Sequence, residues 1–162
     1  MARMSNAARG GGLFRHNVLG LFAAGFISVL VFQSGANAIL HAYGLANQPF
    51  GYVPTKPFGV PGIWSGAFWG GLWGLVFGIA EKYFLRTPLY YVCAFLFGAI
   101  VPVLVLWFIV SPLKGNPTAA GWNTQRMMIQ MLVHGCFGLG VGILVQAFSG
   151  ALTREPARLV EG

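Results

Sequence analysis

Five polar side chains that could bind a ligand or a metal lie at helical spacing inside long apolar stretches of the chain. Gln33, Asn37 and His41 are four residues apart, and so are Gln130 and His134. Residues four apart share one face of an α-helix, so each set would present its amide and imidazole groups together. Such groups can hydrogen-bond a neighbouring helix, hold a polar ligand or, for the histidines, ligate a haem iron.

Four apolar segments must position these residues. The chain has 162 residues, of which 56% are hydrophobic and 8% are charged, and its apolar content exceeds that of an ordinary soluble domain. Each segment has the roughly 20 residues that a helix needs to cross about 30 Å of hydrocarbon. The sequence therefore predicts an all-α fold, a four-transmembrane-helix bundle with spans at about 18–40, 62–80, 89–110 and 127–148.

The basic residues, which give the chain a net charge of +7, are distributed unevenly around these spans. One side has Arg3, Arg9, Arg15, Lys82, Arg86, Arg154 and Arg158. The opposite side has only Lys56, Lys114 and Arg126. Because basic residues are retained in the cytoplasm, both termini are predicted to be cytoplasmic, with outer loops at 41–61 and 111–126. The charge therefore indicates orientation in a lipid bilayer, and no base-reading motif points to nucleic acid.

The predicted organisation is one membrane domain, residues 18–150, between a flexible basic cytoplasmic tail at 1–17 and a second cytoplasmic tail at 151–162. A cleavable signal peptide is an alternative for the first span, because a basic leader, the apolar run 18–32 and the triplet Ala36-Asn37-Ala38 imitate one. The helical pattern continues beyond this triplet, which favours an uncleaved span.

The connections between the spans also carry structural signals. The short inner turn at 81–88 predicts that the second and third spans are antiparallel neighbours. Asn123 and Thr124 are expected N-caps for the fourth helix. The first outer loop repeats a proline-framed motif, PFGYVP and then PFGVP, which predicts a stiff segment that either anchors at the membrane surface or covers a site.

Depth in the membrane relates further residues to the polar ones. At 1.5 Å per residue, Gln33 and His134 lie roughly 10 Å below the outer ends of their helices. Trp69 and the helix kink expected at Pro102 fall at a similar depth. This polar layer either holds the bundle together by hydrogen bonds between helices, or lines an outward-opening cavity that binds a small ligand or passes a solute. A third interpretation makes His41 and His134 haem ligands, although their depths differ by roughly 10 Å.

Acidic residues are absent from all four spans. The chain has no Asp, and Glu81 lies at the inner edge of the second span. Proton-coupled transporters usually need a buried carboxylate in the membrane. There is also no carboxylate pair, no zinc ligand set, no phosphate-binding glycine loop and no serine elbow. The sequence therefore predicts no enzymatic activity, no metal site and, apart from the haem alternative, no cofactor.

A glycine occurs at every fourth position of the second span, namely at Gly62, Gly66, Gly70, Gly74 and Gly78. Small residues at this spacing, as in a glycine zipper, form a shallow groove in which another helix backbone can approach closely. The groove therefore predicts a tight helix interface. Its partner is either another span of this chain or a second protein, which includes another copy of the chain.

Three stretches of the first half, LVFQSGANAILHAYGL, PTKPFGVPG and AFWGGLWGLVFG, together resemble a group of small four-helix bacterial integral membrane proteins of no known activity. In that group the first helix ends with a polar face that includes histidine, and prolines lead into a second helix rich in tryptophan and glycine. This chain has Gln33-Ser34 where the group has a histidine-glutamine pair. The likeness covers about residues 15–80 and implies a multi-pass protein of the bacterial inner membrane.

Taken together, these features predict a non-catalytic integral membrane protein, an accessory, scaffold or assembly component that packs through its glycine groove. The alternative is a small channel or ligand-binding membrane protein that uses the polar layer in the outer half of the bilayer. A haem-binding membrane protein is the third interpretation.

Overall fold

The computed structural model of the chain describes residues 18–46, 48–49, 51–55, 59–85 and 89–152. Four of its helical segments are long and apolar enough to cross a membrane, Val18–Ala42, Gly62–Tyr83, Leu89–Leu113 and Thr124–Ser149. The predicted all-α fold with four membrane-capable helices is therefore confirmed, and the chain has the architecture of a multi-pass membrane protein. The predicted N-terminal tail lies outside the described residues, and so does the predicted C-terminal tail after Leu152. Most of the basic residues used to predict orientation lie outside them as well.

The first segment consists of α1 (Val18–Ser28), one π-helical turn η1 (Val29–Gln33) and α2 (Ser34–Ala42). At the junction, the Ser34 hydroxyl donates a hydrogen bond of 2.9 Å to the Val29 carbonyl, which supplies that irregular turn with a local partner. The helix ends where Gly44 adopts a φ of 71°. The N–H of Gly44 bonds to His41 and that of Leu45 to Leu40, the Schellman pattern that a C-terminal glycine allows.

The second segment begins after a short antiparallel hairpin of β1 (Pro54–Thr55) and β2 (Val60–Pro61), in which Pro54 pairs with Pro61. The Thr55 hydroxyl donates to the Val60 carbonyl at 2.8 Å. The helix α3 (Gly62–Ala80) follows directly and ends in the 3₁₀ turn η2 (Glu81–Tyr83).

The third segment contains α4 (Leu89–Val105), the π-helical turn η3 (Leu106–Val110) and the short α5 (Ser111–Leu113). Pro102, where a kink is predicted, lies inside α4, and the helical backbone continues past it to Val105 before the π-turn.

The fourth segment is α6 (Thr124–Leu152), which follows the 3₁₀ turn η4 (Thr118–Trp122). Asn123 caps α6, because its side-chain oxygen accepts the N–H of Arg126 at 3.0 Å. The predicted cap at Asn123 is confirmed, and with it α6 begins three residues before the span expected from hydropathy.

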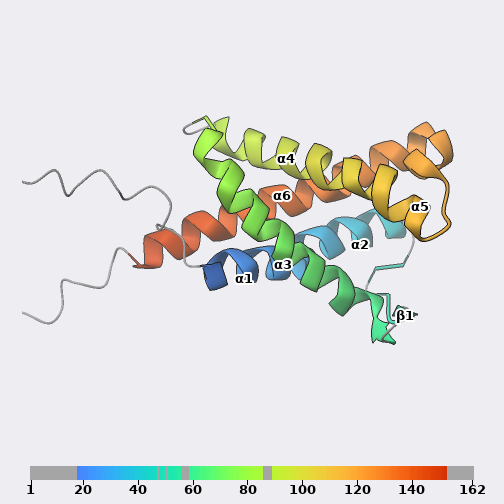
Figure 1. The fold of residues 1–162 in the computed structure, drawn as a ribbon, viewed down its shortest axis with the longest axis horizontal. Helices are drawn as coiled ribbons and strands as arrows, with labels where there is room; N and C mark the ends of the chain where they lie inside the picture. Colours follow the sequence, from blue (N-terminus) through green and yellow to red (C-terminus); the bar gives the residue numbers. More distant parts are fainter. Residues whose placement is uncertain (1–17, 47, 50, 56–58, 86–88, 153–162) are drawn as a thin grey trace, which may run out of the picture.

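The four segments pack as two antiparallel pairs, α1 with α3 and α4 with α6, which are joined where α1 lies against α6. The predicted neighbours α3 and α4 are in contact at Phe77, near the end of α3, and Phe97, in the middle of α4, whose ring centroids are 5.3 Å apart. Figure 1 shows the two helices diverging from there. The short turn joins them, but close backbone contacts hold each of them to another helix.

The first of these close contacts, here called the α1–α3 seam, is formed by Gly25 against Gly70 and Gly74. A Cβ added at Gly70 would lie 3.0 Å from the Gly25 carbonyl oxygen, and one added at Gly25 would overlap the backbone of Gly70. One turn further, a Cβ at Gly78 would overlap the side chain of Leu21. Of the five glycines of the predicted groove, Gly70, Gly74 and Gly78 therefore pack against α1 of the same chain. A Cβ at Gly66 would meet Val29 at 3.9 Å, and one at Gly62 would face the Gly51 carbonyl oxygen at 3.2 Å instead.

The second close contact, here called the α4–α6 seam, is formed by Gly98 and Gly138. A Cβ added at Gly98 would lie 2.7 Å from the Gly138 Cα, and one added at Gly138 would lie 2.8 Å from the Gly98 Cα. Side by side, the two seams enclose a buried cluster around Phe77, Phe137 and Val141. In lipid, such backbone proximity replaces the hydrophobic drive with close van der Waals contact.

The two ends of the bundle differ in their polar groups. The short-turn end, at Glu81–Tyr83, has a tied network in which the Tyr90 hydroxyl donates to Glu81 at 2.7 Å and the Gln146 amide donates to the same oxygen at 3.2 Å. The opposite end, which contains β1, β2 and η4, is here called the hairpin end. The polar groups of the hairpin end line a cavity instead of forming such a network.

Candidate functional site

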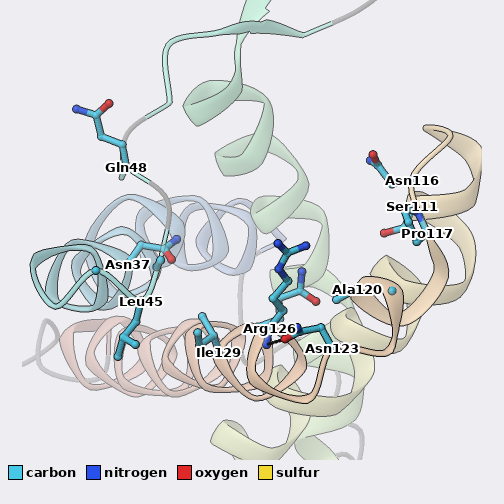
Figure 2. Close-up of a pocket in the computed structure, with 14 residues that line it drawn as sticks. Asn37, Leu45, Gln48, Ser111, Asn116, Pro117, Ala120, Asn123, Arg126 and Ile129 are labelled. Atoms are coloured by element: carbon cyan, nitrogen blue, oxygen red, sulfur yellow. Dashed lines mark hydrogen bonds between the residues drawn. The ribbon is translucent and has the colours of Figure 1, made fainter.

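A half-open cavity of about 990 Å³ lies at the hairpin end, between the segment that follows α2, the α5–η4 connection and the first turns of α6 (Figure 2). Its lining is rich in amide and hydroxyl groups and is formed by Asn37, Gly44, Leu45, Ala46, Gln48, Ser111, Asn116, Pro117, Ala120, Gly121, Asn123, Arg126, Ile129 and Gln130. The cavity is therefore built from three stretches that are distant in sequence.

One side of the cavity depends on how the first segment ends. Asn37 lies on α2, one turn before the Schellman motif that turns the chain at Gly44. That turn brings residues 44–46 and Gln48 to the cavity wall. In Figure 2 the Gln48 amide points away from Arg126. The His41 Nδ1 donates to the Ala46 carbonyl at 3.0 Å, which ties this segment to the helix end.

The opposite side is formed by two turns of unusual backbone. After α5, the N–H of Asn116 bonds to the Ser111 carbonyl at 2.9 Å, with Gly115 at a φ of 72°. This is a second Schellman motif.

The next turn, η4, is left-handed. The φ values of Ala119, Ala120, Gly121 and Trp122 are 49°, 54°, 70° and 57°. Each non-glycine residue in this conformation costs about 1–2 kcal/mol. Ala119 is fully buried against Val103 and Trp107, and this packing holds the turn in place while Ala120 and Gly121 line the cavity.

The base of the cavity is the start of α6, from Asn123 to Gln130. The indole N–H of Trp107 donates to the side-chain oxygen of Gln130. This bond orients the Gln130 side chain and leaves its NH₂ group as the donor at the cavity. Arg126 projects from α6 into the space between the two sides in Figure 2.

Arg126 is the charged residue of the lining. It lies in the first turn of α6, the end of a helix where the dipole disfavours a cation. Glu81, the acidic residue of the described chain, is engaged at the short-turn end. The cavity therefore combines one positive charge with neutral hydrogen-bonding groups.

The predicted polar layer consists of Gln33, Asn37, His41, Trp69, Gln130 and His134. The structure brings two of these six, Asn37 and Gln130, to the cavity. His41 borders the helix end, and its Nδ1 is engaged by Ala46. His134 lies one turn deeper than Gln130, and its Nδ1 donates to the Gln130 carbonyl at 2.8 Å. Neither histidine lines the cavity, so the residues of the haem interpretation do not share a site there.

The two remaining members of the predicted layer lie elsewhere. Gln33 ends the π-turn η1 and is half-buried outside the cavity. Trp69 is 59% exposed on α3 and packs edge-on against Phe68. It therefore does not point to the candidate site.

Several lining residues were not expected from the sequence, namely Gln48, Ser111, Asn116 and Arg126 as ligand-facing groups. In the sequence, Arg126 indicated only membrane orientation, and the others fall in the predicted outer loops, where no periodicity points to a site. The combination of asparagine, glutamine and arginine in both outer loops is the signal that could have found them, because it is unusual in so apolar a chain.

The chemistry available at the cavity is hydrogen bonding and charge pairing. The lining has no carboxylate, thiol or imidazole, and the described part of the chain contains no group of three or more His, Cys, Asp or Glu residues that could hold a metal ion. No family model, curated protein or solved structure matches the chain.

Proposed function

We propose that this is a non-catalytic integral membrane protein that binds a small polar ligand at its hairpin end, which faces away from the cytoplasm. The observation that carries the proposal is the cavity of about 990 Å³ lined by amides, a hydroxyl and one guanidinium. Small-molecule sites typically have volumes of about 300–1,000 Å³. The hairpin end is assigned to the outside because basic residues concentrate on the other side of the spans.

Binding is favoured over permeation because the bundle is filled below the cavity. Ser28 is fully buried, and its hydroxyl donates to the Phe137 carbonyl at 2.7 Å. Val29 and Phe137 are buried beside it and contact the position of Gly70. A solute that reached Asn37 and Gln130 would thus meet closely packed helices rather than a polar path.

The proposal is tested with the full chain in mild detergent, by thermal unfolding in the presence of small polar compounds. A compound that binds the folded state raises the midpoint temperature as its concentration exceeds its Kd. Asn37→Leu, in the lining, should abolish this rise. Gln33→Leu, the same change of polarity one turn deeper, should retain it. If no compound stabilises the protein, or if the two variants respond alike, the cavity is not a binding site.

An assembly role in the bacterial inner membrane is a second candidate function, although the glycine groove on which it was based is occupied by α1. It is favoured by a row of contacting aromatic rings on the α1–α3 face. Phe26 stacks on Trp64 with ring centroids 6.3 Å apart, and Phe22 packs edge-on against Phe68 at 5.9 Å. About half of the surface of Trp64, Phe68 and Trp69 is exposed.

Gentle extraction followed by identification of copurifying subunits tests this role. A partner bound to the aromatic row should be lost from Trp69→Leu and retained by Trp122→Leu, because Trp122 is 68% exposed at the hairpin end instead. Copurification that is absent, or equal in the two variants, contradicts the assembly role.

A further inference from the structure

The hairpin-end cavity holds a positive charge that the described chain does not neutralise. The Asn123 side chain bonds the backbone N–H of Arg126 at 3.0 Å, which fixes the residue at the start of α6 while its guanidinium extends into the cavity (Figure 2). The acidic residue among those the structure describes, Glu81, bonds Tyr90 and Gln146 at the other end of the bundle. In the whole sequence, the only other acidic residues are Glu155 and Glu161.

The Arg126 guanidinium, with no carboxylate in the cavity lining, can bind an oxyanion. Its planar donors match the oxygens of a phosphate or carboxylate group in a bidentate arrangement, and charged hydrogen bonds of this kind are roughly twice as strong as neutral ones. The other side chains of the lining are neutral donors and acceptors, Asn37, Gln48, Ser111, Asn116, Asn123 and Gln130. They suit the hydroxyl groups of a ligand rather than a second charge.

The position of the cavity favours phosphate as the oxyanion. The lining residues come from the ends of the membrane-capable helices and from the loops beyond them, which is the level of the lipid headgroups. Trp122, the last residue of η4, follows the lining residues Ala120 and Gly121 and has an exposed indole. An exposed indole at this level is typical of a tryptophan at a membrane interface. A phosphate ester is the anion that a bilayer presents at this level.

We infer that the ligand of the hairpin-end cavity is a phosphate ester with a hydroxyl-bearing remainder, and that Arg126 binds its phosphate group. This inference rests on the proposed binding function and names the ligand class for it. The same chemistry has two sources, the headgroup of phosphatidylglycerol in the bilayer and glycerol phosphate in solution.

The experiment compares the full chain with Arg126→Gln and Lys114→Gln, all purified in a neutral detergent. Lys114 is the matched control, because it is an exposed cation at the same end but not part of the lining. Glycerol phosphate is titrated by calorimetry, and retention of phosphatidylglycerol is compared with that of phosphatidylcholine by native mass spectrometry. Uncharged polyols are titrated alongside.

The inference predicts that one phosphate probe binds, that Arg126→Gln weakens it about ten-fold or more, and that Lys114→Gln leaves it within about two-fold. Binding of glycerol phosphate assigns the soluble source, and selective retention of phosphatidylglycerol assigns the lipid. If a polyol binds while both phosphate probes fail, or if Arg126→Gln changes nothing, the phosphate inference is overturned and the binding function stands. If no probe binds, both are overturned.

Discussion

The middle of the bundle and its hairpin end use glycine in opposite ways. At the α1–α3 and α4–α6 seams, a Cβ on Gly70, Gly98 or Gly138 would come within 3.0 Å of a neighbouring atom. At the hairpin end, a Cβ on Gly44 or Gly115 would meet nothing within 4 Å. The first group brings helix backbones together, and in the second group Gly44 and Gly115 instead permit the positive φ that turns the chain.

The difference explains where a ligand can be accommodated. The seams leave no room between helices, so the polar groups there are few and bonded to the packing itself, as Ser28 is to Phe137. Beyond the seams the segments separate, and side chains such as Asn37 and Arg126 face open space. Close helix packing and the open cavity thus lie at different depths of one small bundle.

The largest expected effect comes from filling the α1–α3 seam. Gly70→Leu would drive a side chain into Val29 and the Gly25 backbone, so we expect it to lower the free energy of unfolding by more than about 3 kcal/mol or to prevent folding. Leu75→Ala, on the same helix but only half-buried, should cost less. Unfolding in increasing sodium dodecyl sulfate measures both variants, and equal losses would refute the seam.

A smaller change separates the glycines of the seams from a glycine outside them. Gly138→Ala places its Cβ against the backbone of α4 and should cost about 1–3 kcal/mol. Gly35→Ala meets open space and should be neutral or stabilise the helix by up to about 1 kcal/mol. The same unfolding measurement applies, and a destabilised Gly35→Ala would remove the contrast between glycines inside and outside the seams.

Gln130→Leu tests the border between packing and binding. The change leaves the Trp107 N–H without its acceptor and should cost about 1–2 kcal/mol of unfolding free energy. It should also weaken ligand binding, since Gln130 lines the cavity. Gln33→Leu, outside the lining, is the control, and a Gln130→Leu variant with unchanged Trp107 fluorescence and unchanged stability would contradict the assigned bond.

The smallest effect is expected at the left-handed turn. Ala120→Gly relieves a non-glycine residue at a φ of 54° and should stabilise the protein by about 0.5–1 kcal/mol, because the strain relieved exceeds the entropy added to the unfolded chain. Ala94→Gly, in the right-handed α4, should destabilise it instead. A loss of stability in Ala120→Gly, measured by thermal unfolding, would show that the turn is not strained.

Hydropathy and local chemistry were enough for much of the fold. The span expected at 62–80 coincides with α3, and the cap expected at Asn123 is present. Such features depend on residues that are neighbours along one helix. The α4–α6 seam was not predicted, because Gly98 is isolated in its own span and becomes informative only opposite Gly138.

The candidate site shows the same limit. Helical spacing placed Gln33, Asn37 and His41 on one face and Gln130 with His134 on another, and depth related Gln33 to His134. Only Asn37 and Gln130 line the cavity. Depth is a coordinate along each helix, whereas a cavity also requires that the side chains face the same lateral direction. Asn116 joins the site through a turn whose course no periodicity describes. Arg126 comes from the first turn of α6, which the sequence had placed in the outer loop.

By itself, the sequence determined that the chain forms four membrane-capable helices, because the cost of burying backbone polar groups in hydrocarbon leaves long apolar segments one stable conformation. It also placed the glycines of α3 on one side, since they are four residues apart. Only the tertiary structure decided that α1 packs against Gly70, Gly74 and Gly78 and that the hairpin end remains open around Arg126. The physical reason is that helix pairing depends on which surfaces interlock in three dimensions, and local pattern does not contain that choice.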